Sequence, residues 1–214
     1  MKQLVFGTGD LAEMLFSNLQ KEGIEVSAFL LTVEGDAKFC GKPVVPLRQA
    51  TKLYPPGEYG VYICIGYKRM NMGRKKVFDE VSALGYPVLS YIHPTAQISG
   101  SYGVGIIAFQ NVSVDFGAHM GIANILYPYT VVSHHTVIED FNYFAPCSCV
   151  AGRVKIGSFC FIGANATLRD HISISDYSLL GAGCYVDSDT EPYAVVVPTR
   201  SLTLSGRKSI DINL

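Results

Sequence analysis

The chain has 214 residues, of which 49% are hydrophobic and 16% charged, and its 17 basic and 18 acidic side chains leave a formal net charge of −1. This length allows one or two domains, and the charge balance excludes the diffuse attraction to nucleic acid or anionic membranes that a strongly basic protein would have. No apolar run approaches the roughly 18 residues of a membrane span, and the chain starts in a strand-like segment rather than a signal peptide. We therefore expect a soluble, cytoplasmic protein with no nucleic-acid or membrane partner.

The first half of the chain alternates strand and helix patterns. Apolar strands are predicted at residues 2–6, 24–31, 61–65 and 88–91, and helices at 11–21 and 70–84. Strands separated by helices favour a parallel sheet covered by helices. Charge density and apolar spacing change near Tyr91, so we predict an α/β, Rossmann-like domain over residues 1–90.

The first predicted strand runs into a G-x-G-x-x-A motif that contains Gly7, Thr8, Gly9 and Asp10. Glycines at this place let the backbone approach a phosphate at the positive end of the following helix. Because the predicted domain is about half of a full dinucleotide-binding fold, the motif favours a mononucleotide or a nucleotide sugar over NAD. A tight turn without a ligand is the alternative.

A second candidate segment follows the strand at 61–65. Since the carboxyl ends of parallel strands meet at one edge, this segment should face the same crevice as Gly7 to Asp10. Its cations are candidates for pairing with a pyrophosphate; alternatively, they are simply solvated side chains at the start of a helix. Its Tyr or Asn is a candidate for contacting a base or sugar. After the second strand, either Glu34 or Asp36 is a candidate contact to ribose or base. The segment contains Gly66, Tyr67, Lys68, Arg69, Asn71 and Arg74.

The second half of the chain repeats every six residues. All fourteen positions in steps of six from Ala108 to Val186 are apolar, and we call them landmark residues. This is the hexapeptide pattern of a parallel β-helix, in which each hexad forms one side of a prism and the landmark fills its interior. Ile92, Ile98 and Val104 are offset by two, so we expect an insertion or a loose first turn near residues 103–108. We predict a β-helix domain over residues 91–214, with a C-terminal tail and with flat faces that other copies of the chain cover.

Two adjacent histidines, His134 and His135, follow the landmark Val132. This position places them near a corner or on the outer surface, where an imidazole can act as a general base. A metal is the alternative. His135 and His171 occupy the same position of the hexad but lie two coils apart, a distance of roughly 9–10 Å that one zinc ion cannot bridge. Metal ligation between subunits by His119 and His134 stays open. The six cysteines contain no C-x-x-C pair, so we expect reduced, mostly buried thiols.

The hexads, the segments SHHTVIEDF and FAPCSCVAGRVKIGSFCFIGANA, the G-T-G-D motif and the segment IGYKRMN together resemble the sialic acid O-acetyltransferase and nucleotide-amino-sugar N-acetyltransferase group of hexapeptide-repeat enzymes. The resemblance covers nearly the whole chain. It implies a left-handed β-helix, a homotrimer with acetyl-CoA between neighbouring prisms, no metal, and an N-terminal domain that holds the nucleotide of the acceptor sugar. It also implies that His134 is the general base, with no covalent acyl-enzyme.

The chain departs from that family at one position. The family usually has an acidic residue after the catalytic histidine, and this chain has His135. Asp115, one coil earlier, or another carboxylate is then a candidate to orient His134, or His135 itself contacts the substrate.

Small residues also match positions that line the pantetheine groove in the family, although each is equally compatible with a simple corner turn. These are Gly152, Gly163, Ala164, Gly181 and Ala182.

The segments IGYKRMN and FCGKPVVP look most like the branch that acts on nucleotide-linked 4-amino-4,6-dideoxy sugars, with dTDP as the expected nucleotide. The expected function is therefore an acetyl-CoA-dependent N-acetyltransferase in bacterial surface-polysaccharide or glycan assembly. UDP in place of dTDP stays open, as does O-acetylation of a sialic-acid-like sugar. Because the acidic neighbour of His134 is missing, a non-catalytic nucleotide-sugar sensor or scaffold is the competing class.

Overall fold

The first domain is an open sheet whose strand order reverses beside β1. In the computed structural model, which describes residues 1–199, the order is β3-β4-β2-β1-β5, and only β3 and β4 pair antiparallel. The chain moves from β1 outward to β2 and β4 and then returns to β5 on the other side of β1, so a ligand crevice is expected at the carboxyl ends of β1 and β5. The strands are β1 (Lys2–Phe6), β2 (Val26–Leu31), β3 (Lys38–Phe39), β4 (Lys42–Pro46) and β5 (Tyr59–Ile63).

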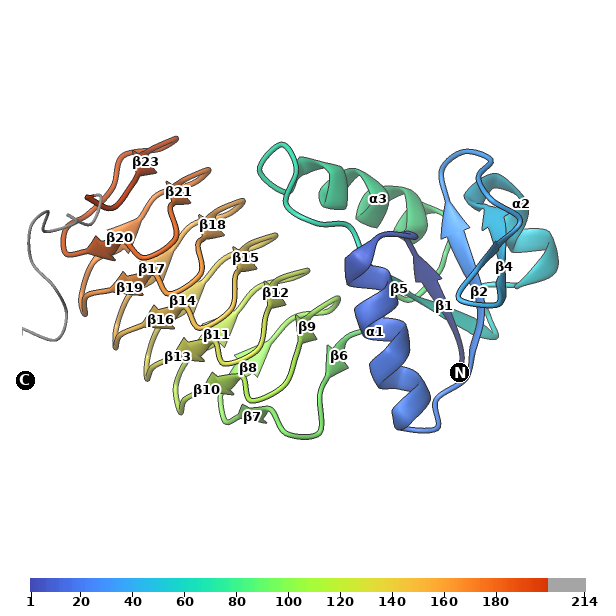
Figure 1. The fold of residues 1–214 in the computed structure, drawn as a ribbon, viewed down its shortest axis with the longest axis horizontal. Helices are drawn as coiled ribbons and strands as arrows, with labels where there is room; N and C mark the ends of the chain where they lie inside the picture. The colour runs from blue at the N-terminus through green and yellow to red at the C-terminus, as the bar shows by residue number, and fades with distance from the viewer. Residues whose placement is uncertain (200–214) are drawn as a thin grey trace, which may run out of the picture.

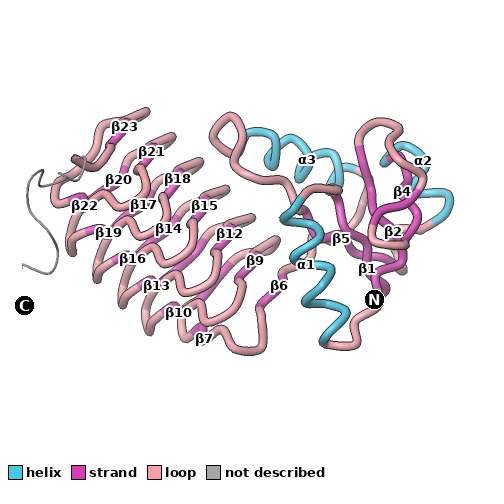
Figure 2. Tube along the Cα trace, in the orientation of Figure 1, coloured by secondary structure: helices cyan, strands magenta, loops and turns pink. Residues whose placement is uncertain are grey.

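Three helices accompany this sheet, and Figure 2 shows them confined to the first domain. They are α1 (Asp10–Lys21), α2 (Leu47–Leu53) and α3 (Met72–Ala83). The sequence predicted α1 and α3 to within two residues and missed α2, β3 and β4. The predicted strand at 88–91 is wrong, because Val88 forms only an isolated bridge to Val61 and Tyr91 already belongs to the β-helix.

The second domain is a parallel β-helix with three faces (Figure 1). The first face holds β6-β9-β12-β15-β18-β21-β23, the second β7-β10-β13-β16-β19-β22 and the third β8-β11-β14-β17-β20. The left-handed sense predicted for hexapeptide repeats fits these stacked parallel sheets. The strands are β6 (Tyr91–Ile92), β7 (Gln97–Ile98), β8 (Ser101–Tyr102), β9 (Ile107–Ala108), β10 (Ser113–Val114), β11 (His119–Met120), β12 (Ile125–Leu126), β13 (Val131–Val132), β14 (Val137–Ile138), β15 (Tyr143–Phe144), β16 (Cys149–Val150), β17 (Lys155–Ile156), β18 (Phe161–Ile162), β19 (Thr167–Leu168), β20 (Ser173–Ile174), β21 (Leu179–Leu180), β22 (Tyr185–Val186) and β23 (Val195–Val196).

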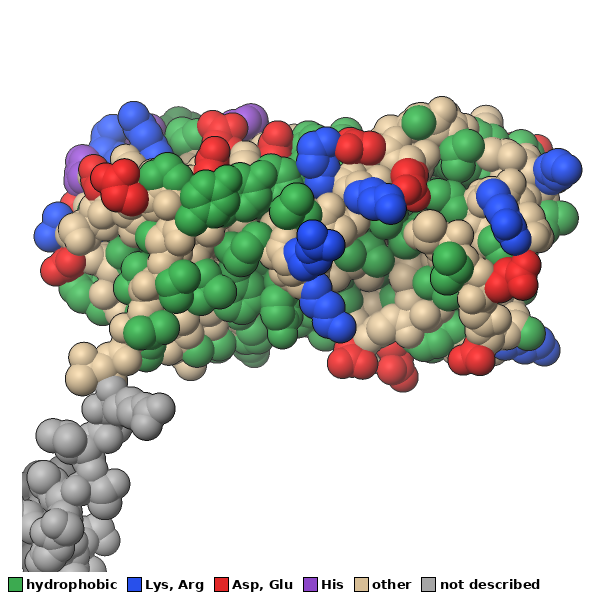
Figure 3. Space-filling model, turned by 90° about the horizontal axis from the view of Figure 1, so that it is seen from above, with side chains coloured by type: hydrophobic (Ala, Val, Ile, Leu, Met, Phe, Trp, Pro, Cys, Tyr) green, Lys and Arg blue, Asp and Glu red, His purple; other side chains and the backbone are tan. Residues whose placement is uncertain are grey.

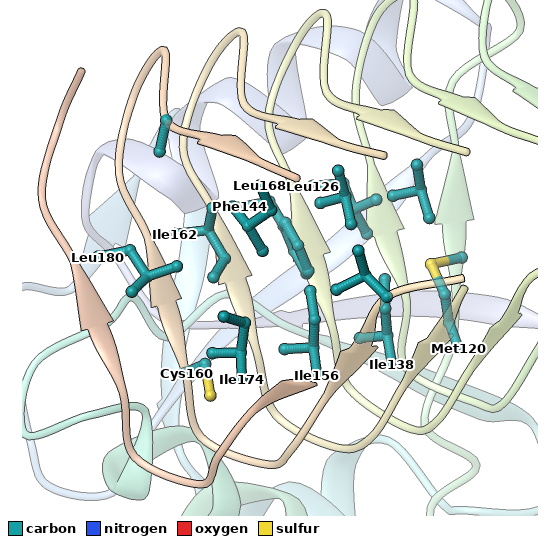
Figure 4. Close-up of a cluster of buried hydrophobic side chains, with 14 of the residues drawn as sticks. Met120, Leu126, Ile138, Phe144, Ile156, Cys160, Ile162, Leu168, Ile174 and Leu180 are labelled. Atoms are coloured by element: carbon teal, nitrogen blue, oxygen red, sulfur yellow. The ribbon is translucent and has the colours of Figure 1, made fainter. Parts of the chain in front are cut away.

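The landmark residues form the core of the β-helix. Each of the fourteen is at most 4% exposed. Figure 4 shows landmark side chains such as Met120, Phe144 and Leu168 pointing into the prism, one from each face. Each full coil adds eighteen residues, so that Val114 pairs with Val132 and Val132 with Val150. The hexapeptide prediction is therefore confirmed in its most specific feature, the identity of the inward-pointing side chains.

The first coil corrects one expectation, because it is shortened rather than extended. Ile98 pairs with Val114, sixteen residues away, whereas Tyr102 pairs with Met120, eighteen residues away. Two residues are therefore missing between Ile98 and Tyr102, and the insertion expected near residues 103–108 is wrong. A Cβ on Gly100 would overlap the carbonyl oxygen of Ala118, so this glycine permits the tight corner.

The two domains share a hydrophobic core along the first face. Leu11 and Leu15 of α1 belong to the same buried cluster as Ile107, Ile125 and Tyr143 of the β-helix, and α1 lies beside β6 and β9 in Figure 1. Seen from above in Figure 3, hydrophobic side chains cover much of the β-helix, whose charged and histidine side chains lie along one edge, while charged side chains are spread over the α/β domain. Within residues 1–199, no helix is long and apolar enough to cross a membrane. The C-terminal end of the second predicted domain, residues 200–214, where the sequence predicts a tail, lies outside the described part of the chain.

Candidate functional site

A cavity of about 380 Å³ lies where the strand order predicts it. It is lined by residues that follow β1, by residues that follow β5 and by two tyrosines of the β-helix. The structure thus brings together five of the sequence-predicted binding residues, Gly9, Asp10, Gly66, Tyr67 and Lys68. The remaining lining residues are Leu11, Cys64, Ile65, Tyr127 and Tyr143.

The G-T-G-D motif shapes one side of this crevice. Gly7 has a φ of +116°, and a Cβ there would lie 2.6 Å from the carbonyl oxygen of Cys64, so only glycine lets the ends of β1 and β5 approach so closely. Thr8 is half-buried beside it. Gly9 is the N-cap of α1, and no side chain caps this helix. The N–H of Ala12 bonds to the carbonyl of Gly9, whereas those of Asp10 and Leu11 have no backbone partner among the described residues and can donate to an anion.

Aromatic rings from the β-helix form the floor of the crevice. Tyr67 packs edge-on against Tyr143 and tilted against Phe161, at ring-centroid distances of 5.0 and 4.9 Å, and Tyr127 lies 5.1 Å from Tyr143. Burial raises the pKa of both Tyr127 and Tyr143, so their phenols stay neutral and can donate hydrogen bonds. Sequence reasoning missed these two tyrosines. The available signal was the recurrence of aromatic residues eighteen positions apart, in Tyr143 and Phe161.

Two predicted crevice residues are placed elsewhere. Arg74 is 1% exposed and Asn71 0% exposed; both bond to backbone carbonyls of the β-helix. The prediction that Arg74 pairs directly with a pyrophosphate is therefore wrong, as is a base or sugar contact by Asn71. Local charge cannot reveal that the start of α3 faces another domain.

The remaining candidates of the first domain lie at its surface. Arg69 and Asp36 are exposed and do not line the cavity. Glu34 forms an exposed ion pair of 3.1 Å with Arg48 and also lies outside the cavity lining. The structure therefore does not join the end of β2 to the crevice.

The two histidines form a second cluster on the edge shared by the second and third faces. Both imidazoles are exposed, and their Nδ1 atoms are 3.1 Å apart. His135 has a left-handed backbone with a φ of 57°, as do Arg153 and His171 in the following coils. A Cβ on Gly152 would lie 2.7 Å from Cε1 of His134, so this glycine makes room for the imidazole. We call this group of residues the histidine edge.

The contact between the histidines is chemically asymmetric. In a bond between two Nδ1 atoms, one ring donates its N–H and the other accepts through a lone pair. If His134 donates, its Nε2 is unprotonated and can accept a proton from a substrate, while His135 serves as the acceptor that an acidic neighbour usually provides. Asp115 is exposed, and its backbone N–H bonds to Val132. In the described part of the chain, no hydrogen bond joins the carboxylate of Asp115 to the imidazole of His134.

The predicted acetyl-CoA residues occupy both edges of the second face. Gly152 belongs to the histidine edge, while Gly163, Ala164, Gly181 and Ala182 lie on the edge shared with the first face. A Cβ on Gly163 would lie 2.5 Å from the backbone nitrogen of Ala182, so packing between coils already requires this glycine. Ala164 and Gly181 are half-buried, and Ala182 is exposed.

The other nucleophilic and metal-ligating groups of the described chain do not cluster. Within residues 1–199, no group of three or more His, Cys, Asp or Glu side chains is arranged to hold a metal ion. His119 bonds through Nδ1 to Oγ of Ser101, at 2.9 Å. All six cysteines are free, and burial raises the pKa of the thiols of Cys64 and Cys160. Cys147 is exposed, and Cys40 and Cys149 are partly so.

No family model matches the chain, but several solved structures do. A perosamine N-acetyltransferase from Caulobacter crescentus, solved as a histidine-to-asparagine variant with CoA and GDP-perosamine, is 23% identical with a TM-score of 0.83 over 91% of this chain and 92% of that one. The acetyltransferase domain of PglB from Neisseria gonorrhoeae is 20% identical with a TM-score of 0.81, over 91% and 95%; another structure of that domain contains acetyl coenzyme A. WeeI from Acinetobacter baumannii is 20% identical with a TM-score of 0.83, over 92% and 97%. The chain thus has, over nearly all of its length, the two-domain fold of these acetyltransferases.

Proposed function

We propose that the protein is an acetyl-CoA-dependent N-acetyltransferase that acts on the amino group of a nucleotide-linked 4-amino-4,6-dideoxy sugar. The observation that carries the proposal is the combination of a crevice suited to a nucleotide with an exposed histidine pair on this particular fold. The product would serve the assembly of bacterial surface polysaccharide or other glycans.

The crevice suits a nucleotide sugar because it offers one group for each part of that ligand. The uncapped start of α1 and Lys68 can bind the diphosphate. The rings of Tyr67, Tyr127 and Tyr143 provide an aromatic surface with hydroxyl groups, which suits a base or a deoxysugar. The sequence resemblance favours dTDP, whereas the neighbour from Caulobacter crescentus was solved with a GDP-linked sugar, so the base must be settled by assay.

His134 would supply the base catalysis. Its Nε2 accepts the proton of the sugar amine as the amine nitrogen attacks the thioester carbonyl of acetyl-CoA. A backbone N–H stabilises the resulting oxyanion. The tetrahedral intermediate then collapses, the carbon–sulfur bond breaks, and the departing sulfur takes the proton from His134, which yields the N-acetyl sugar and CoA. The hydrogen bond of 3.1 Å to His135 would hold His134 in the required tautomer.

A complete site needs two copies of the chain. The crevice lies against the first face, whereas the histidine edge joins the other two faces and is therefore on the opposite side of the prism. Tyr127 and His134 belong to one coil and Tyr143 begins the next, so the crevice and the histidines lie at nearly the same level along the axis. We propose a homotrimer in which His134 of one subunit faces the crevice of its neighbour, with acetyl-CoA between the two prisms.

A panel of dTDP-, UDP- and GDP-linked amino sugars tests the proposal, with release of the CoA thiol as the readout. Release with an amino sugar, and not with the matching hydroxyl sugar, would support N-acetylation. Release with a hydroxyl sugar would assign the chain to O-acetylation. The missing acidic neighbour of His134 favours one competing function, a nucleotide-sugar scaffold, and tight sugar binding without thiol release would identify it.

A further inference from the structure

Arg74 is a fully buried cation that has no acidic partner within residues 1–199. Its side chain is 1% exposed. All of its hydrogen bonds go to backbone carbonyls: Nε to Ala123 at 3.0 Å, Nη1 to Ile65 at 3.1 Å, and Nη2 to Phe141 and Asn142 at 2.9 Å each. Among residues 1–199 no carboxylate forms an ion pair with it.

These bonds fasten the crevice to the β-helix. Ile65 lines the crevice, whereas Ala123 and Phe141 lie in successive coils on the edge between the third and first faces. Asn71 extends the attachment by one more coil, because its Nδ2 donates to the carbonyl of Cys160 at 3.1 Å. The start of α3 is therefore tied to three consecutive coils through the side chains of Asn71 and Arg74.

The attachment supports a strained turn at the crevice wall. Arg69, Met70 and Asn71 are three consecutive non-glycine residues with left-handed backbones, with φ values of 53°, 49° and 63°. This conformation is costly for such residues and persists only where surrounding contacts hold it. Immediately before the turn, Tyr67 and Lys68 line the crevice. The bonds of Asn71 and Arg74 thus position these two side chains.

No carboxylate of residues 1–199 pairs with the charge of Arg74. Carbonyl dipoles satisfy its N–H groups but carry no net charge, and desolvation lowers the pKa of the guanidinium to about 9. The phenols of Tyr127 and Tyr143 line the crevice and are neutral, because burial raises their pKa. An anion in the crevice would therefore experience a buried positive charge that salt screens poorly.

We propose that Arg74 is a positioning residue of the crevice and that the diphosphate of the bound nucleotide sugar serves as the counter-charge of its buried guanidinium. The inference rests on the proposed function, since it deepens the description of the acceptor site. It also explains why a cation is kept at a place where it cannot touch the ligand.

The test compares the affinities of dTDP, UDP and GDP with those of the corresponding uncharged nucleosides by calorimetry. In Arg74→Met, which keeps the chain length and removes the charge, the preference for the diphosphate over the nucleoside should fall by about tenfold or more. Lys76→Met is the matched control, because it removes an exposed charge two residues further along α3 and should leave this preference unchanged. Displacement of Lys68 would also weaken the diphosphate selectively, so a second variant, Arg74→Lys, separates the charge of Arg74 from its positioning role.

Arg74→Lys keeps the charge and loses the planar fork, and it provides the test if the Met variant does not fold. Its preference for the diphosphate should stay within about threefold of wild type even if both affinities fall. A folded Met variant with the wild-type preference, or a folded Lys variant that loses it, would overturn the role of the charge and leave the proposed function standing. If the wild type binds none of the nucleotides, the proposed crevice ligand and this inference fall together.

Discussion

His135 is the residue at which this chain departs from the acetyltransferases it resembles, and its replacement gives a sharp prediction. Its Nδ1 lies 3.1 Å from Nδ1 of His134, and both rings are exposed. A bond between neutral groups contributes about 0.5–1.5 kcal/mol. His135→Ala should therefore lower kcat by about two- to thirteenfold, because the His134 tautomer with a free Nε2 loses its support.

Two further variants separate orientation from side effects. His135→Glu replaces the neutral acceptor by a carboxylate, whose bond is roughly twice as strong, so its kcat should equal or exceed the wild-type value. His135→Asn keeps an oxygen acceptor and suits the left-handed backbone, with a φ of 57° at this position, so it controls for strain in the alanine variant.

The assay is steady-state CoA release over a range of pH, with kcat and the acceptor KM determined separately. An effect of His135→Ala confined to kcat, with rescue by Glu, supports orientation of His134. A rise in the acceptor KM with unchanged kcat would mean that His135 contacts the substrate. Unchanged kinetics in His135→Ala, or an inactive but folded His135→Glu, would refute the reasoning.

Three other predictions concern the glycines and the assembly. Gly7→Ala should lower the free energy of unfolding by about 1–3 kcal/mol, since the added Cβ would lie 2.6 Å from the carbonyl oxygen of Cys64. Gly57→Ala is the control, because a Cβ there meets nothing within 4 Å. Equal denaturation midpoints of the two variants would contradict the packing argument. Gly152→Ala should displace the imidazole of His134 and lower kcat by about tenfold or more without changing the midpoint of thermal unfolding. A wild-type kcat in this variant would show that the contact between Gly152 and His134 does not affect catalysis. Trimers mixed from His134→Ala subunits and crevice-filled Gly66→Trp subunits should regain part of the activity that each parent lacks, whereas inactive mixed trimers would place the whole site in one subunit.

The sequence predicted the interior of the β-helix because a strict repeat determines which side chains point inward. The offset by two of Ile92 and Ile98 indicated an irregular first coil, but the period did not show that the coil is shortened, which depends on the close approach of Gly100 to Ala118. The crevice was predictable because strand order determines where the carboxyl ends of β1 and β5 meet.

The roles of individual polar residues were harder to predict. Arg74 reads as a surface cation in the sequence, and only the contact between domains shows that it is buried. Tyr127 and Tyr143 belong to the β-helix pattern and reach the crevice because the first domain packs on the first face. The neighbouring histidines were evident in the sequence, but the contact between their Nδ1 atoms depends on side-chain geometry.

The most direct test of the central claim follows CoA thiol release by wild type and by His134→Ala across the panel of nucleotide-linked amino and hydroxyl sugars. The account predicts turnover by wild type with an amino sugar, and a rate about 10²- to 10⁴-fold lower in His134→Ala with the acceptor still bound. Near-normal turnover by His134→Ala, or tight binding of the amino sugar to wild type without any thiol release, would contradict it.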